Sequence, residues 1–409
     1  MRKIELPKIT FWRVVLAVIM VLGVYATGYR FIKGLGASTA LSDSFPWGLW
    51  IGFDVLCGVG LAAGGFTITA AVYIFNIKKY KPIIRSTILT AFLGYILVST
   101  ALLYDLGRPY RIWHPIVMWN PHSVMFEVAW CVMLYSAVLA LEFIPVILEK
   151  FNMEKPLKIL KSISIPLVLA GFLLSTLHQS SLGTLFLIVP EKLNGLWYSP
   201  LLPLFFFVSA IGAGLAMVIF ESFLSYRFFK KELEIDLLEG LSRVIVVILG
   251  AYFALRMLDL FHRDAIGLVF NSGIEGPLFI AEILVGVVIP FILLTIPQVR
   301  VNKKGLFISA LMVVIGFVMN RLNVSITGMA ASSGVEYFPT WMEMAVTAFI
   351  VGIGFIVFGV AVKYLPIFEA AKEKEAVEKE REYSYEALPG EAALAIESSY
   401  DRIDSDRKV

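Results

Sequence analysis

The sequence is poor in the residues that most enzyme chemistry requires. Its 409 residues include only 2 cysteines and 4 histidines. Cys57 and Cys131 both fall in apolar runs, and an iron–sulfur cluster usually needs four cysteine ligands, so we expect no cluster in this chain. The sequence also lacks metal-ligand spacing, a P-loop and a nucleophile motif, which argues against metalloenzymes and nucleotide hydrolases.

The few histidines argue against haem b as well. A haem held by two histidines in a membrane needs two facing imidazoles at membrane depth. His114 and His122 lie in or beside one long loop, and no pair matches obviously between spans. The pair His178 and His262 stays open. We therefore expect a chain without haem.

Charge is also scarce. Only 16% of the residues are charged and 58% are hydrophobic, with a mean hydropathy of +0.81. A soluble domain is about half apolar and about a quarter charged, so this composition predicts an integral membrane protein. Residues 369–409 contain 12 acidic and 7 basic residues, a net charge of −5 within a total of +3. The remaining +8 suits loops at an anionic membrane surface and not a nucleic-acid partner.

Long apolar runs divide the chain into membrane spans. A span needs roughly 20 apolar residues, and ten runs approach that length, of which the ninth is short. The fold class is therefore all-α, with about ten transmembrane helices. The predicted spans are 11–32, 47–75, 83–104, 123–148, 163–189, 201–228, 244–261, 276–296, 306–319 and 341–364.

The distribution of lysine and arginine orients these spans. With ten spans both termini share one side, and the loops on that side hold most of the basic residues. By the positive-inside rule that side is the cytoplasm, so we expect a multi-pass protein of the cell's inner (cytoplasmic) membrane with both termini cytoplasmic. Residues 1–368 form the predicted transmembrane domain, and residues 369–409 form a charged cytoplasmic tail, partly helical or disordered.

Ionisable residues inside spans are costly and usually functional. The predicted topology places most of them in the outer half of the membrane, beneath a long loop with three prolines and two tryptophans at 105–123. Glu142 and Glu221 are exceptions near the inner face. The outer residues are Asp54, Asp105, Glu127, His178, Arg256, Asp259, His262, Glu282, Arg321 and Glu343.

A purely structural role is the alternative for each of these residues. Arg256 and Asp259 are three residues apart on one helix face and could neutralise each other. His178 could be hydrogen-bonded across helices. Asp54 and Glu127 have no base within four residues, so each must find a partner on another helix, stay protonated or contact a ligand.

Glycine pairs in the apolar runs have a simpler explanation. Gly60 and Gly64 form a GxxxG pattern, and Gly212–Gly214 and Gly352–Gly354 are similar. Small residues at these spacings let two membrane helices approach closely. We interpret all of them as packing positions.

The outer cluster of acids, histidines and arginines suits an amphipathic ligand with a redox-active head, namely a quinone. Quinone reduction takes up two protons, which carboxylates and a histidine can deliver. Asp54, Glu127 and His178 are the main candidates for a quinone and proton site, with Arg256 and Asp259 as a supporting pair. A proton path is predicted through four further carboxylates, Glu282, Glu343, Glu142 and Glu221.

Several long motifs resemble one known family. They are GLGASTALSDSFPWGLWIGFD at 34–54, YDLGRPYRIWHPIVMWNPHSVMFEVAWCVMLY at 104–135, STLHQSSLGTLF at 175–186, RLNVSITG at 321–328 and PTWMEMAV at 339–346. They are similar to the NrfD/polysulfide-reductase membrane-subunit family, and within it to the HybB branch, the membrane subunits of nickel–iron hydrogenases. The resemblance covers about residues 10–366.

The resemblance implies two four-helix bundles with extra helices and a quinone-reactive subunit without haem or cluster. It implies menaquinone or ubiquinone as bound substrate, and H₂ oxidation coupled to quinone reduction. An iron–sulfur ferredoxin-like subunit would dock on the outer face, next to the large and small subunits of a nickel–iron hydrogenase. The predicted docking loop and quinone mouth comprise Asp105, Arg108, Arg111, Trp113, His114 and His122.

Two other classes of protein also place acids in the membrane. A secondary transporter or proton channel would have midplane sites at broken helices and an internal repeat. The sequence shows acids near one face and no convincing repeat, which counts against this class. The second alternative is a membrane anchor without a quinone site of its own, in which the charges only pair with one another.

Overall fold

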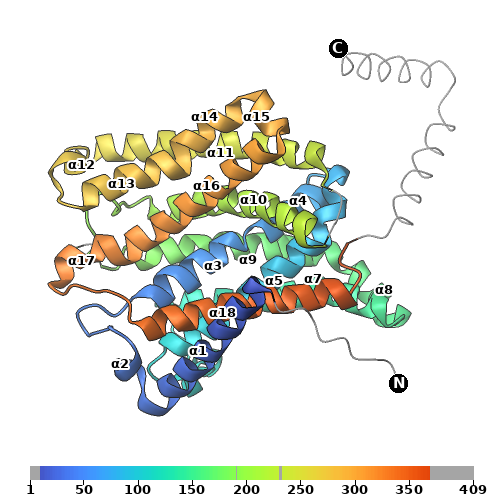
Figure 1. Cartoon of the computed structure of the whole chain (residues 1–409), viewed down its shortest axis with the longest axis horizontal. Coiled ribbons are helices and arrows are strands. Elements are labelled where there is room, and N and C mark those ends of the chain that lie inside the picture. Colours follow the sequence, from blue (N-terminus) through green and yellow to red (C-terminus); the bar gives the residue numbers. More distant parts are fainter. Residues whose placement is uncertain (1–9, 190, 230–232, 369–409) are drawn as a thin grey trace.

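A computed structural model describes residues 10–189, 191–229 and 233–368, and within these ranges it contains helices and no strand. Ten helical segments are long and apolar enough to cross a membrane, which confirms the predicted fold class. They lie side by side along the long axis of the molecule (Figure 1). The spans are Phe11–Lys33, Trp50–Tyr73, Lys78–Asp105, Val124–Lys150, Ser164–Leu185, Leu202–Phe229, Ile235–His262, Glu275–Thr295, Lys303–Ala330 and Trp341–Tyr364.

Most of these spans are single helices without a change of helix type. They are α1 (Phe11–Lys33), α7 (Val124–Lys150), α9 (Ser164–Leu185), α10 (Leu202–Phe229), α11 (Ile235–His262) and α18 (Trp341–Tyr364). A 3₁₀ turn, η2 (Lys78–Ile83), precedes α5 (Ile84–Asp105). Short helices in the connections are α2 (Leu35–Ser38), η3 (Pro109–Arg111), α6 (His114–Val117), α8 (Glu154–Ser162), α12 (Leu268–Asn271) and α15 (Pro297–Val301).

The second, eighth and ninth spans each contain a π-helical turn, in which an N–H bonds the carbonyl five residues back. The second span runs through η1 (Trp50–Val55), α3 (Leu56–Leu61) and α4 (Gly64–Tyr73). The eighth runs through α13 (Glu275–Ile283), η4 (Leu284–Val288) and α14 (Ile289–Thr295). The ninth runs through α16 (Lys303–Leu322), η5 (Asn323–Thr327) and α17 (Gly328–Ser333). Single π turns occur often at functional sites.

Two of the predicted spans are shorter than the helices in the structure. The seventh span begins at Ile235 and not at residue 244, and the ninth extends well past residue 319. In the seventh, Arg243 bonds Glu239 at 2.8 Å one turn away, so charged residues continue the helix beyond the apolar run. In the ninth, polar residues after Met319 remain helical because their side chains are buried in a hydrogen-bonded network.

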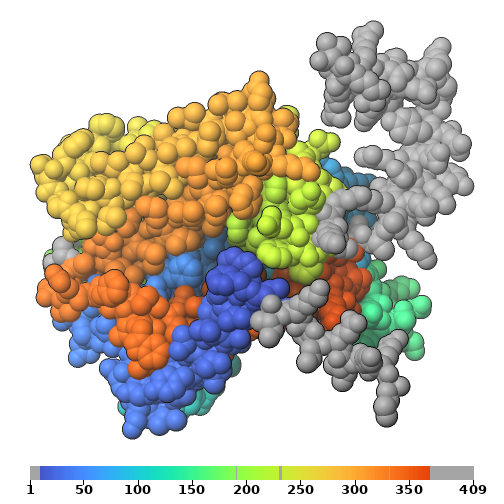
Figure 2. All heavy atoms as spheres, in the orientation of Figure 1, coloured from blue at the N-terminus to red at the C-terminus, as the bar shows by residue number. Residues whose placement is uncertain are grey.

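The helices form two four-helix bundles and one outer pair. The first bundle contains the second to fifth spans, and the second bundle contains α10, α11, α13–α14 and α16. Helix α10 packs against α4 and α9 of the first bundle and so joins the two. Helices α1 and α18 pair with each other, and α18 packs on α5. In Figures 1 and 2, both helices of this pair lie at the surface of the molecule.

Glycines mark the two closest helix crossings. A Cβ on Gly214 of α10 would lie 2.3 Å from the backbone N of Gly64 of α4. A Cβ on Gly316 of α16 would lie 1.9 Å from Cα of Gly286 in η4. No side chain fits either crossing, so the predicted packing role is confirmed for Gly64 and Gly214.

The connections at the two ends of the molecule differ in their content of basic residues. We call the end formed by residues 74–83, 151–163 and 296–304 the basic end, because it carries Lys78, Lys79, Lys81, Lys155, Lys158, Lys161, Arg300, Lys303 and Lys304. We call the other end the aromatic end; it is formed by residues 34–49, 106–123, 186–189, 191–201, 263–274 and 334–340. The predicted tail at 369–409 lies outside the described residues.

Candidate functional site

Asp54 lies in the π turn η1, near the aromatic end. Its side chain is buried, and its Oδ2 accepts a hydrogen bond of 2.6 Å from the Oγ1 of Thr347 on α18. No cationic side chain forms an ion pair with it among the residues that the structure describes. On the same turn, Gly52 packs against Ser325 of the π turn η5 in the ninth span. The carboxyl of Asp54 is therefore held in place by a neutral hydroxyl and a rigid helix contact.

Glu343 is fixed near Asp54 by the start of α18. Its Oε2 accepts hydrogen bonds from the backbone N of Thr340 at 2.9 Å and of Ala40 at 3.0 Å. Its Oε1 accepts a bond of 2.5 Å from the hydroxyl of Tyr337. Burial raises the pKa of Tyr337, so this hydroxyl stays protonated and donates. These contacts form a capping box and account for Glu343 as a helix-start residue.

His178 lies near the middle of α9 and is fully buried. Its ring lies 5.6 Å from the ring of Tyr95 on α5, which in turn stacks edge-on against Tyr135 of α7 at 4.6 Å. Neither imidazole nitrogen has a hydrogen-bond partner among the described residues. A buried polar atom without a partner is uncommon and calls for an explanation.

Glu127 lies close to the aromatic end of the molecule, near the start of its span. It lies in the first turn of α7 and is exposed, and its Oε1 accepts a hydrogen bond of 2.5 Å from Ser181 of α9. A carboxylate in the first turn of a helix is stabilised by the positive end of the helix dipole. Of the possibilities left open for Glu127, the structure shows a partner on another helix, and its part in a quinone site stays a prediction.

Arg256 and Asp259 also differ from the prediction, because they do not pair with each other. Asp259 bonds Arg263, one turn further along α11, at 2.8 Å, and accepts a bond of 2.6 Å from Ser199. Arg256 donates to the carbonyl of Leu196 at 2.7 Å and lies between the rings of Phe205 and Phe279. Arg263 is partly exposed, whereas Arg256 is fully buried. An ion pair of Asp259 with Arg263 therefore requires less desolvation of the arginine than a pair with Arg256 would.

Glu282 is the centre of a buried polar network in the second bundle. It accepts hydrogen bonds from Trp197 at 2.9 Å, Asn320 at 2.7 Å and Asn323 at 2.8 Å. Arg321 extends the network by donating to Asn320 at 2.6 Å. Every oxygen of Glu282 is thus occupied by protein donors.

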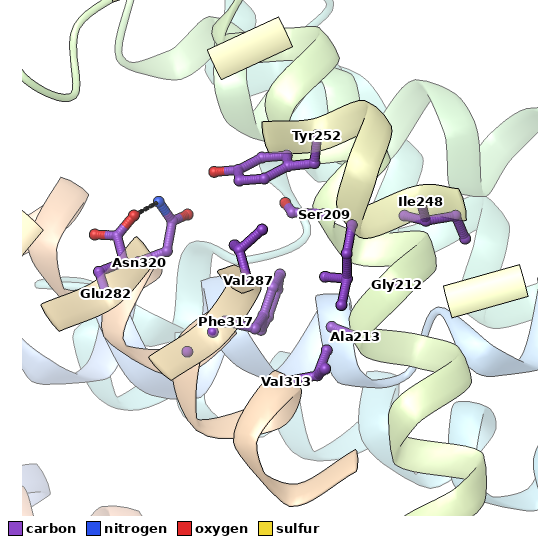
Figure 3. Close-up of a pocket in the computed structure, with 13 residues that line it drawn as sticks. Ser209, Gly212, Ala213, Ile248, Tyr252, Glu282, Val287, Val313, Phe317 and Asn320 are labelled. Atoms are coloured by element: carbon purple, nitrogen blue, oxygen red, sulfur yellow. Dashed lines mark hydrogen bonds between the residues drawn. The ribbon is translucent and has the colours of Figure 1, made fainter. Parts of the chain in front are cut away.

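A small cavity adjoins this network. Figure 3 shows Tyr252 and Ser209 on one side of it, and Glu282 and Asn320, joined by their hydrogen bond, on the other. Its volume is about 30 Å³, which is room for a water molecule and not for a quinone ring.

The predicted docking loop lies at the aromatic end and is largely exposed. The side chains of Arg108, Arg111, Trp113 and His122 are exposed, and His114 is half-buried against Trp113 at 4.5 Å between ring centroids. Asp105 ends α5 next to this loop and is half-buried. The loop therefore presents cations and aromatic rings outward.

The two inner carboxylates lie in separate places near the basic end. Glu221 of α10 is buried and accepts a bond of 2.6 Å from Thr90. Glu142 of α7 is half-buried and lines a cavity of about 380 Å³ that is also lined by α4, α5, α8 and α9. No hydrogen bond or ion pair joins either carboxylate to Glu282 or Glu343 among the described residues, and a proton path through the four stays a prediction.

The five main candidates for a site likewise do not form one cluster. Asp54 contacts Thr347 of α18, His178 contacts Tyr95 of α5, and the Asp259 pair belongs to the second bundle. The sequence cannot tell which helices face each other. It also missed Thr347, Asn323 and Ser199, which carry no charge and so gave no signal above the apolar background.

The family model "Polysulphide reductase, NrfD" matches residues 37–332. The chain belongs to the NrfD family. It is 34% identical to the probable Ni/Fe-hydrogenase 2 b-type cytochrome subunit of Escherichia coli, over 85% of this chain and 89% of that protein. It is 29% identical to the menaquinone reductase integral membrane subunit of Nitratidesulfovibrio vulgaris, over 90% and 94%. It is 28% identical to a selenate reductase subunit of Mesobacillus selenatarsenatis, over 88% and 94%. This NrfD-family chain is therefore similar to subunits of several oxidoreductases, one of which is a menaquinone reductase.

The comparison contradicts the prediction of a chain without haem, because the E. coli relative is named a b-type cytochrome subunit. The histidines of this NrfD-family chain can be tested against such a group. His178 is buried with both ring nitrogens unpartnered, but His262 and His122 are exposed and His114 lies in a loop helix. Among the described residues a haem held by two facing buried histidines does not fit, and we derive no electron step through haem.

Proposed function

We propose that this chain is the quinone-reactive membrane subunit of a respiratory oxidoreductase. It would pass electrons between a partner subunit at the aromatic end and a membrane quinone, with menaquinone or ubiquinone as the substrate. The observation that carries the proposal is Asp54: a buried carboxyl on a π turn whose one side-chain hydrogen bond, within the described ranges, comes from the hydroxyl of Thr347. An ion pair would lock such a group in one charge state, whereas a hydroxyl leaves it free to exchange a proton.

Quinone reduction requires the membrane subunit to bind the quinone and to deliver protons to it. Reduction of a quinone takes two electrons and two protons and yields the quinol, with no other atom gained or lost. A carboxyl that reaches the quinone carbonyl can donate one of these protons and be reprotonated afterwards. The relatives support this proposal, since one is named a menaquinone reductase subunit and another a hydrogenase subunit.

The electron-donating partner would bind at the loop 106–123. This loop exposes Trp113 and Trp119 together with Arg108 and Arg111, a combination of aromatic and arginine side chains that is enriched in protein interfaces. An iron–sulfur subunit joined to a nickel–iron hydrogenase, which oxidises H₂, is the partner that the hydrogenase relative favours. Positive-inside bias supports an aromatic end on the outer side of the cytoplasmic membrane, with the basic end inside.

The test is the substitution Asp54→Asn in the assembled complex. It keeps the size and the hydrogen bond to Thr347 but removes the exchangeable proton. We expect quinone-linked turnover to fall by about 10²-fold or more, the range lost with a positioned acid. Electron transfer from the partner to an artificial dye should stay normal, because the dye bypasses the membrane subunit.

A pair of variants at Thr347 controls for the hydrogen bond. Thr347→Val removes the hydroxyl and should lower quinone-linked turnover, whereas Thr347→Ser keeps it and should not. His178→Ala is expected to impair the same activity with dye-linked activity retained. Normal quinone-linked turnover in both Asp54→Asn and His178→Ala would refute this site.

A further inference from the structure

A cavity of about 380 Å³ opens near the basic end, between α4, α5, α7 and α9 and beneath α8. Its rim is charged: Glu149 bonds Arg85 at 3.0 Å and Lys161 at 3.2 Å, and Lys81 lies beside them. Seven residues before Glu149 on the same helix, Glu142 also lines the cavity. Seven residues span about 10 Å along a helix, so the cavity leads from a charged rim into the membrane interior.

Beyond Glu142 the first bundle contains an unusual group of polar atoms. Seven buried side-chain atoms on six residues lack a partner that meets strict hydrogen-bond geometry among the described residues, although the hydroxyls of Tyr135 and Ser175 lie near enough to interact with each other. All seven lie on three helices that pack against one another. These atoms are the hydroxyls of Tyr95, Tyr135, Ser136 and Ser175, both ring nitrogens of His178 and Oε1 of Gln179. We call this set the polar file.

Contacts connect the cavity to the polar file. Gly171 of α9 has no side chain, and a Cβ there would lie 3.6 Å from Oε1 of Glu142 and 3.7 Å from the ring of Tyr135. Glu142 and Tyr135 therefore flank the same spot. From Tyr135 the rings continue to Tyr95 at 4.6 Å and from Tyr95 to His178 at 5.6 Å.

The file ends at the level of His178. Next to it, Nε2 of Gln179 donates a bond of 3.1 Å to the carbonyl of Val59. Ser181, the next polar residue of α9 on this side, is already bonded to Glu127 and to its own helix. The series of unpartnered atoms thus runs from the basic-end half of the bundle to His178, in its aromatic-end half, and stops there.

Water is the physical explanation for such a series. A buried polar group without a hydrogen-bond partner is costly, so a set of them on adjoining helices would strongly destabilise the fold. Buried water molecules typically make about three hydrogen bonds each to polar groups of this kind. The hydroxyls, imidazole and amide oxygen offer both donors and acceptors along the series, as a hydrogen-bonded file of water requires.

We propose that the polar file is a water-filled proton inlet that leads from the basic-end cavity past Glu142 and Gly171 to His178. A proton would move from bulk water at the basic end to the imidazole of His178, with no change in electrons. The role of this inlet rests on the proposed function: its protons would replace those that the quinone takes up during reduction. Electrons would then enter at the aromatic end and protons at the basic end.

The first experiment tests the water path without any quinone chemistry. Ser175→Cys and Ser309→Cys are a matched pair, since both serines are buried with unpartnered hydroxyls, but Ser309 lies on α16 in the second bundle. Each is introduced into the full chain with Cys57 and Cys131 replaced by alanine. We expect silver ions added to the folded protein to block later thiol labelling at position 175 and not at position 309.

A plug variant extends this test. Gly171→Leu fills the space between Glu142 and Tyr135 without removing a polar atom, and should restore thiol labelling at position 175 after silver treatment. Gly359→Leu, at a glycine with nothing within 4 Å of its Cβ position, is the control and should not. A thiol at position 175 that is as inert to silver as the one at 309 overturns the inlet, whatever the quinone activity.

The second experiment uses the assembled complex in proteoliposomes with a pH-sensitive dye on the side of the basic end. Glu142→Gln and Gly171→Leu should lower proton uptake from that side by roughly 100-fold, the lower range for loss of positioned proton transfer. Gly359→Leu should leave it unchanged. Silver accessibility at position 175 with normal quinone turnover in both Asp54→Asn and His178→Ala would refute the proposed quinone site and leave the water path standing.

Discussion

Replacing Glu282 by leucine is the most direct test of how the second bundle is held together. The carboxylate accepts three hydrogen bonds from Trp197, Asn320 and Asn323, which come from a connection and from the ninth span. Glu282→Leu leaves all three donors buried without an acceptor. At about 1–3 kcal/mol for each buried unpaired donor, the loss is about 3–9 kcal/mol.

Glu221 provides the matched comparison in the same protein. It is also buried in a span, but it accepts one hydrogen bond, from Thr90. Glu221→Leu should therefore cost about 1–3 kcal/mol, roughly a third as much. Glu282→Gln, which keeps one acceptor oxygen, should lie between the wild type and Glu282→Leu.

The assay is thermal unfolding of the purified chain in detergent, followed by tryptophan fluorescence. We expect the melting temperature of Glu282→Leu to fall far below that of Glu221→Leu. Equal melting temperatures for the two leucine variants would refute the reasoning, because the number of stranded donors would then not decide stability. A drop in quinone-linked turnover in Glu282→Gln with an unchanged melting temperature would instead support the predicted proton path through this residue.

Two further predictions concern helix packing and partner binding. Gly316→Ala places a Cβ 1.9 Å from Cα of Gly286, and should lower stability by about 1–3 kcal/mol or more, whereas Gly359→Ala has free space and should not. Similar melting temperatures for these two variants would contradict the crossing. Arg111→Gln in the exposed loop should weaken capture of the complex's partner subunits and reduce the salt dependence of that capture. Capture that is unchanged at low and high salt would contradict a docking role for this loop.

The architecture followed from the sequence because apolar runs of sufficient length have few alternatives to a membrane helix. The depth of Asp54, Glu282 and Glu343 followed in the same way, from their positions within those runs. Errors arose where polar residues continue a helix, as at the start of the seventh span and the end of the ninth. There the deciding factor is a side-chain partner, such as Glu239 for Arg243, and not the hydropathy of the run.

The composition of the site was much less accessible to prediction. Asp54 and Thr347 are 293 residues apart, and nothing local to either residue indicates that they meet. The predicted Arg256–Asp259 pair had suitable spacing, yet a second arginine one turn further on competes successfully for the carboxylate. The predicted start of the fourth span, residue 123, is one residue from the start of α7 at Val124, but an apolar run does not show which face of the first turn, with Glu127 on it, is exposed.

The three π turns make the geometry of this protein sensitive to the number of residues in a helix. In each turn one backbone N–H donates to the carbonyl five residues back, and not four. These bonds run from Leu56 to Ile51, from Ile289 to Leu284 and from Gly328 to Asn323. A π turn holds one residue more than an α-helical turn, so deleting a single residue there restores an ordinary helix and leaves the flanking residues on their original faces. A deletion in the α-helical part of the second span would instead rotate everything on one side of it by about 100°, and would turn Asp54 away from Thr347 while leaving the span long enough to cross the membrane. In alignments of this family, a one-residue gap at these turns marks the loss of a π turn, whereas a gap elsewhere in a span marks a change in the face that the helix presents.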